Sequence, residues 1–250
     1  MNFFILTFIL TLFTFQECFA GIPADVKKCR TADLVCIAKT TTEILHKYPN
    51  GNEELGLRKI EPVHLDQMVI ARKDGNNPLN LNFRFTDLDI SGLSKTNITK
   101  VVGFEKDPKK SKFEVYAITP ELRIYGHYEA NGRILLLPIV GSGIADIKMK
   151  NYKSGIKVKF AINKEEDGKQ RLTISKLKVQ NDVESMNIQL ENLFNGNKVL
   201  SEELMKVVND NWRDVWNELE SGINEGYSDI VKLLFSEVLK GLDYDEFYID

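Results

Sequence analysis

The pattern of apolar and polar residues in 120–143 predicts a β-hairpin. In the first half, one parity is apolar and the other is charged or polar, as in a strand with one buried face; the apolar set is Leu122, Ile124, Tyr128 and Ala130. Asn131-Gly132 then supplies two residues that readily take the positive φ of a tight hairpin turn. Residues 134–140 are almost all apolar, so both faces of the return strand must be covered.

Two other stretches carry apolar residues every three or four positions, which is typical of helices. The first covers residues 34–48 and ends at Pro49-Asn50-Gly51. The second covers residues 204–238 and passes Gly222 and Gly226 without losing phase. Charged residues between its apolar positions argue against a membrane span, so this long helix needs a partner within the protein.

The chain between the two helices alternates with a period of two and predicts a long antiparallel meander. A reversal of parity at Thr86-Asp87 indicates a bulge or a bend. Turns are expected at Lys153-Ser154-Gly155 and Asp167-Gly168. The other predicted strands cover residues 63–69, 79–90, 113–119, 144–149, 156–162, 172–179 and 183–190. The sequence therefore predicts an α+β fold in which a strongly curved antiparallel sheet wraps around the long C-terminal helix.

Composition and charge narrow the class of protein only slightly. The 250 residues are 43% hydrophobic and 28% charged, which is ordinary for a globular chain of one or two domains. A formal net charge of −3 argues against a dedicated nucleic-acid binder, which would need a basic surface.

The first twenty residues are read as a secretory signal peptide that ends at Ala20. Residues 3–15 are apolar apart from threonines, and this run is short for a membrane anchor, which is the alternative interpretation. The expected domains are therefore the signal peptide, 1–20, and one ligand-carrier domain, 21–250.

Cys29 and Cys36 are the cysteines left in this secreted chain, and such a pair should form a disulfide. Asn97-Ile98-Thr99 is a glycosylation sequon.

The sequence contains no recognisable catalytic or metal-binding constellation. Gly141-Ser142-Gly143 has neither the spacing of a nucleophile elbow nor the Gly-Lys pair of a phosphate loop, so a bulge or bend is the preferred interpretation. His46, His64 and His127 are isolated from one another, although His127 could touch the polar end of a ligand. We therefore expect no enzyme activity, no cofactor and no metal.

Several motifs resemble those of the takeout and juvenile hormone binding protein family of insects. They include the paired cysteines, Leu88-Asp89-Ile90-Ser91-Gly92-Leu93, the whole of residues 120–143, Asn192-Leu193-Phe194-Asn195-Gly196 and Asn209-Asp210-Asn211-Trp212. The resemblance covers nearly all of the mature chain. It implies a fold like that of lipid-transfer proteins, with an internal hydrophobic cavity, and a secreted carrier of an elongated apolar molecule such as a terpenoid or a fatty-acyl lipid.

Eight side chains are candidates for lining that cavity, although each could instead belong to the core: Phe83, Phe85, Tyr116, Ile124, Tyr128, Leu136, Trp212 and Trp216. The alternative to a carrier is a secreted interaction or signalling protein whose interior is filled by its own side chains. Two groups of lysines could form a membrane-docking patch or simply the solvent-exposed faces of strands. They are the lysines at 106, 109, 110 and 112 and those at 148, 150, 153, 157 and 159. The expected partner is a hydrophobic small molecule, with a transient membrane or receptor contact possible and no nucleic acid, and the protein is expected to be a monomer.

Overall fold

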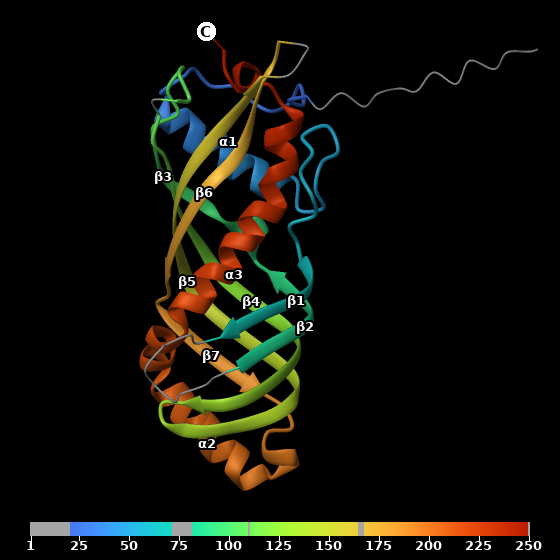
Figure 1. Cartoon of the computed structure of the whole chain (residues 1–250), viewed down its shortest axis with the longest axis vertical. Coiled ribbons are helices and arrows are strands. Elements are labelled where there is room, and N and C mark those ends of the chain that lie inside the picture. Colours follow the sequence, from blue (N-terminus) through green and yellow to red (C-terminus); the bar gives the residue numbers. More distant parts are fainter. Residues whose placement is uncertain (1–20, 72–81, 110, 165–167, 250) are drawn as a thin grey trace, which may run out of the picture.

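One antiparallel sheet of seven strands curls along the length of the molecule, and the longest helix runs along its concave face (Figure 1). The computed structural model describes residues 21–71, 82–109, 111–164 and 168–249. The predicted signal peptide, residues 79–81 of a predicted strand and Asp167 of a predicted turn lie outside these ranges. The α+β fold expected from the sequence, a curved sheet around a long C-terminal helix, is confirmed.

The sheet has the order β1-β2-β4-β5-β6, with β3 added beside β4 and β7 beside β5. In chain order the elements are α1 (Leu34–Lys47), β1 (Val63–Ala71), β2 (Asn82–Ser91), the 3-10 turn η1 (Leu93–Lys95), β3 (Asn97–Val102), β4 (Phe113–Ile134), β5 (Leu137–Lys164), β6 (Gln170–Asp182), β7 (Ser185–Leu190), η2 (Phe194–Gly196), α2 (Lys198–Asp210), α3 (Trp212–Gly241) and η3 (Tyr244–Phe247).

The predicted irregularity at Thr86-Asp87 is confirmed. The register between β2 and β4 shifts between Thr86 and Asp89, and Asp87 has a positive φ of 51°. Gly126 of β4 faces this bulge, where a Cβ atom would lie 2.7 Å from the carbonyl oxygen of Asp87. The bulge therefore bends β2 at a point that only a residue without a side chain can face.

The hairpin forms, but the prediction of its turn at Asn131-Gly132 is wrong. β4 and β5 stay paired up to Ile134 and Leu137, and the turn residues are Leu135 and Leu136, with φ of 48° and 70°. The backbone N–H of Leu135 donates to the Glu218 carboxylate of α3 at 3.0 Å. Tertiary contacts of this kind place leucines in a conformation that local preference would give to asparagine or glycine.

The predicted turn at residues 153–155 and the separate strands around it are also wrong, because β4 and β5 are continuous. Their pairing keeps one register throughout, but the inward-facing parity reverses near Pro120 and Asn151. Ala117 and Thr119 are buried on one side of this point and Leu122 on the other. Asn151, whose φ is 45°, lets the ribbon change face without a break.

Gly141 and Gly143 produce no bulge, since the register of β5 is unbroken there. A Cβ atom on Gly143 would lie 2.7 Å from the carbonyl oxygen of Glu191, and one on Gly141 would lie 2.9 Å from the Cα of Leu193. The two glycines therefore let the segment that leads to η2 cross close to the backbone of β5.

The apolar stripe of residues 204–238 is divided between two helices, α2 and α3, which meet at Asn211. Its inward face is buried as the pattern predicts: Leu204, Val208, Val215, Trp216, Tyr227, Ile230, Val231 and Leu234. Asn209 fixes α2 to the sheet, because its side chain accepts from the N–H of Ile188 at 2.8 Å and donates to the carbonyl of Ile188 at 2.9 Å.

Within the described residues, no helix is both long enough and apolar enough to span a membrane.

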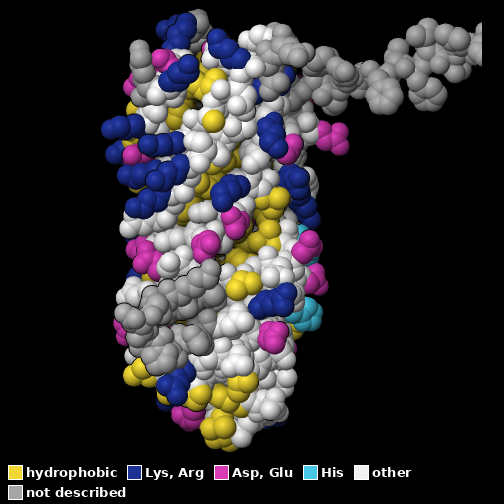
Figure 2. Space-filling model, viewed as in Figure 1, with side chains coloured by type: hydrophobic (Ala, Val, Ile, Leu, Met, Phe, Trp, Pro, Cys, Tyr) yellow, Lys and Arg dark blue, Asp and Glu magenta, His cyan; other side chains and the backbone are white. Residues whose placement is uncertain are grey.

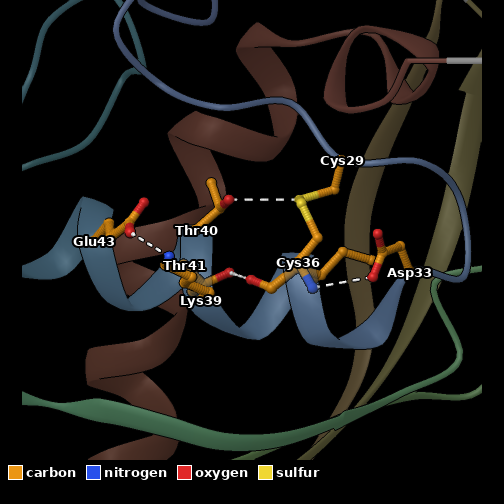
Figure 3. The surroundings of a disulfide bond; sticks show 8 residues. Cys29, Asp33, Cys36, Lys39, Thr40, Thr41 and Glu43 are labelled. Carbon is orange, nitrogen blue, oxygen red and sulfur yellow. Dashed lines mark hydrogen bonds and ion pairs between the residues drawn. A yellow bond between two sulfur atoms is a disulfide. The ribbon is translucent and has the colours of Figure 1, made fainter.

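The first helix, α1, forms where the sequence predicts it and is fixed by the disulfide between Cys29 and Cys36 (Figure 3). The Asp33 side chain accepts from the N–H of Cys36 at 3.1 Å and caps the helix. The carbonyl of Cys29 in turn accepts from the N–H of Ile249, so the disulfide joins the first turn of α1 to the C-terminal segment.

Replacing both cysteines by serine should lower the free energy of unfolding by about 2 to 3 kcal/mol, because the bond closes a short loop and so restricts the unfolded chain. Urea unfolding of the oxidised wild type and of the double variant measures this difference. Equal midpoints and slopes for the two proteins would show that the disulfide does not stabilise the fold.

Candidate functional site

A partly enclosed cavity of about 50 Å³ lies between the concave face of the sheet and the two C-terminal helices. All of its lining residues are apolar: Ile70, Phe83, Phe85, Ile124, Ile134, Ile139, Ile147, Met149, Met186, Ile188, Leu190, Met205, Val208, Leu219 and Ile223. They come from β1, β2, β4, β5, β7, α2 and α3, so the cavity exists only in the assembled fold.

The register of the sheet arranges the lining side chains in rows. Ile124 of β4 lies opposite Ile147 of β5, which lies opposite Ile188 of β7. Met149 and Met186 form a second cross-strand pair. Because side chains alternate along a strand, the residues between these positions point away from the cavity. The sheet side of the cavity is therefore lined by isoleucine and methionine side chains from neighbouring strands.

Aromatic rings form one wall. Phe83 and Phe85 lie with ring centroids 4.8 Å apart, and the Tyr128 ring stacks on Phe83 at 5.5 Å. The Tyr128 hydroxyl donates to the carbonyl of Glu191 at 2.6 Å, and burial raises the pKa of Tyr128 to about 12. The hydroxyl therefore stays protonated at physiological pH and keeps this bond to the segment after β7.

The structure brings three of the eight candidate lining residues to the cavity: Phe83, Phe85 and Ile124. Tyr128 and Trp216 are buried in the core beside the cavity but are not among its lining residues. Trp212 is half-buried, and its ring lies 4.3 Å from the Arg213 guanidinium.

Tyr116 and Leu136 lie away from the cavity. Tyr116 precedes the parity reversal at Pro120, so its side chain is on the outer face, where its hydroxyl donates to Glu114 at 2.7 Å. Leu136 is a turn residue and is 73% exposed. His127 also points outward, into an open polar hollow that it shares with Arg84, Glu129 and Ser142.

Sequence reasoning missed most of the lining, including all three methionines: Met149, Met186 and Met205. The alternation of Met186, Ile188 and Leu190 marks the inward parity of β7 and could have identified these three residues. Met205 follows Leu204 in the predicted helix but is not part of its apolar stripe. Six of the eight predicted lining residues are aromatic, although a cavity wall can equally be built from flexible aliphatic side chains.

The cavity is small beside pockets that hold ligands, which typically enclose about 300 to 1,000 Å³. An elongated ligand can therefore enter only if the lining moves apart. Two features allow such a movement: Met149, Met186 and Met205 have flexible side chains, and α2 is a separate helix after the break at Asn211.

No group of three or more His, Cys, Asp or Glu residues is arranged to hold a metal ion in the part of the chain that the structure describes. The apolar lining residues of the cavity offer a ligand apolar contact.

The sequence and the fold of this chain are similar to those of several known proteins. Residues 6–249 match the family model described as haemolymph juvenile hormone binding protein (JHBP). The circadian clock-controlled protein daywake of Drosophila yakuba is 27% identical over 230 residues, which cover 91% of this chain and 88% of that protein. The juvenile hormone-binding protein of Manduca sexta is 31% identical over 71 residues, 28% of this chain and 30% of that protein. The crystal structure of Takeout 1 from Epiphyas postvittana superimposes with a TM-score of 0.76 and 28% identity, covering 88% of this chain and 98% of that one.

Proposed function

Since the chain belongs to the haemolymph juvenile hormone binding protein family, we propose that it is a secreted carrier that holds an elongated apolar molecule between its sheet and its C-terminal helices. The observation that carries the proposal is the partly enclosed cavity, whose lining residues, among those the structure describes, are all apolar. A terpenoid or a fatty-acyl chain fits this chemistry, and the name of the Manduca sexta relative favours a terpenoid. No catalytic role is proposed. Asn97, the proposed glycosylation site, is exposed at the start of β3.

The energetics allow useful affinity even after the cost of opening the site. Burying about 14 methylene groups contributes about 11 kcal/mol. Lost translational and rotational freedom costs several kcal/mol. The remainder corresponds to micromolar or tighter binding.

The delipidated protein should bind an environment-sensitive fatty-acyl probe, and long-chain acids and farnesoic esters should displace it at micromolar concentration. Affinity should rise with chain length until the site is full, with a negative heat-capacity change and weak salt dependence. Equal competition by a short polar ester would contradict an apolar site.

Val208→Trp should weaken probe uptake at least tenfold, because Val208 is 2% exposed and lines the cavity, so the larger ring occupies the space of the ligand. Overpacking of this kind also costs about 1 to 3 kcal/mol of stability. Val207→Trp is the matched control, since Val207 is the neighbouring residue of α2 and is 37% exposed. Equal uptake by the two variants would place the ligand elsewhere.

The small volume of the cavity also favours a second candidate, an interaction protein whose interior is filled by its own side chains. Organic extraction of the purified secreted protein distinguishes the two. A carrier yields, or after delipidation takes up, about one equivalent of apolar ligand, whereas a filled interior takes up none.

A further inference from the structure

A cluster of lysines lies on the outer face of strands β5 and β6, farther along β5 than the part that lines the cavity. Lys157 of β5 lies directly opposite Lys178 of β6, and Lys159 lies directly opposite Lys176. All four side chains are exposed. We call Lys157, Lys159, Lys176 and Lys178 the lysine cluster. Figure 2 shows Lys and Arg side chains gathered along one side of the upper half of the molecule, the half in which Figure 1 draws β6 and the later part of β5.

The pairing of lysine with lysine across β5 and β6 destabilises the folded protein. Residues directly opposite each other on neighbouring antiparallel strands have Cβ atoms about 5 Å apart, and like charges at such positions repel. In the described part of the chain, Lys157 has one ion pair, with Glu114 at 3.3 Å, and the other three lysines have none. The protein as a whole has a formal charge of −3, so the cluster is a local concentration of positive charge on a mildly acidic molecule.

The cluster continues as a row along β5. Lys148, Lys150 and Lys153 are also exposed on this strand, so the row from Lys148 to Lys159 extends for about 35 Å at 3.3 Å per residue. Lys153 lies opposite Asp182, whose carboxylate already pairs with Arg213. A row of this length fits a linear polyanion, which can contact several lysines in sequence.

Two features favour a soluble polyanion over a lipid surface. The exposed large hydrophobic residues of the described chain include none between residues 148 and 182, so the row lacks the apolar anchors of membrane-binding surfaces. In addition, anionic lipids are concentrated in the cytoplasmic leaflet, whereas the location proposed above is extracellular.

We infer that the lysine cluster binds a linear sulfated polysaccharide of the extracellular matrix or cell surface, and so retains the carrier near cells while the cavity holds its ligand. This inference rests on the extracellular location proposed above. It does not depend on the chemistry of the apolar ligand.

The test measures the anisotropy of a fluorescent heparin oligosaccharide on titration with the full mature chain at several salt concentrations. Wild type should bind with an affinity that falls steeply as salt rises. The variant with Lys157, Lys159, Lys176 and Lys178 all changed to glutamine should bind at least tenfold more weakly and with a slope shallower by about 2 to 4, since each lost contact releases about one counterion fewer. Changing the same four residues to arginine should preserve binding.

The matched control changes Lys39, Lys198, Lys206 and Lys232 to glutamine. It removes the same charge from exposed positions on the helices, so it should bind nearly as tightly as wild type. Equal weakening of the two glutamine variants would overturn the proposal, because binding would then follow net charge alone. Tighter binding to vesicles containing phosphatidylserine, or equal competition by a single-stranded oligonucleotide, would also overturn it.

Uptake of the fatty-acyl probe, measured on the same variants, should not change, so failure of the cluster and failure of the carrier function give different results.

Discussion

Trp216→Ala should lower the free energy of unfolding by about 3 to 5 kcal/mol, the range measured for removal of a large buried aromatic side chain. Trp216 is 1% exposed in the core between α3 and the sheet, and its ring meets that of Tyr152 edge to face at 6.1 Å. Tyr152 is itself 1% exposed and belongs to the paired part of β5, so little can move to fill the space left by the indole. Chemical denaturation followed by far-UV circular dichroism measures the effect.

Trp212→Ala is the control for this prediction. The two tryptophans are four residues apart on the same helix, but Trp212 is only half-buried and packs against the exposed side chain of Arg213. Trp212 also packs against the main core, so its removal should cost less than that of Trp216 but still about 1 to 3 kcal/mol. A larger loss from Trp212→Ala than from Trp216→Ala would mean that α3 presents a different face to the sheet.

Gly92→Ala should also destabilise the protein by about 3 kcal/mol or more. Gly92 has a φ of 105°, which costs a residue with a side chain about 1 to 3 kcal/mol. A Cβ atom there would also lie 2.0 Å from the carbonyl oxygen of Glu121, which is backbone of β4 and cannot rotate away. The strand would have to shift, and the N–H of Gly92 would lose its 2.9 Å bonds to the Glu61 carboxylate. Thermal unfolding of the purified variant measures the loss.

Gly168→Ala separates the two causes. Gly168 also has a positive φ, of 82°, but nothing lies within 4 Å of the position of its Cβ atom. This substitution should therefore cost only the backbone strain, about 1 kcal/mol. If the two variants melted at the same temperature, the close approach of Gly92 to β4 would not determine the stability of this region.

The sequence was sufficient to predict the helical and the strand regions of the chain, because the 3.6 and 2 periods change between them, but it did not predict β3 or the division of the last helix into α2 and α3. It was insufficient to predict where the strands turn. Asn131-Gly132 has the better local turn preference, but the pairing of β4 with β5 and the bond from Leu135 to Glu218 select Leu135-Leu136 instead. These contacts join residues far apart in the chain and leave no local pattern.

The sequence predicted an apolar cavity inside the fold but did not predict most of the residues that line it. Phe83, Phe85 and Ile124 follow from alternation, because β2 and the second half of β4 keep one inward parity between irregularities. Tyr116 does not follow, because the reversal at Pro120 depends on the conformation of Asn151 on the neighbouring strand. Trp216 is fully buried and Trp212 only partly, a difference that the shared apolar stripe of the two residues does not specify.

Strand β5 carries a cavity-lining residue, Met149, between two lysines of the outer row, Lys148 and Lys150. Substitutions can therefore change the preference for an apolar ligand and the charge of the outer surface separately during evolution, one residue at a time. Insertions and deletions act differently. Removing a single residue from this part of β5 would exchange the two faces over the rest of the strand, placing lysines in the cavity and isoleucines in water. Relatives that keep this fold should accordingly differ freely in the residues of β5 but vary in its length only at the hairpin turn or at positions such as Asn151, where the chain already changes face.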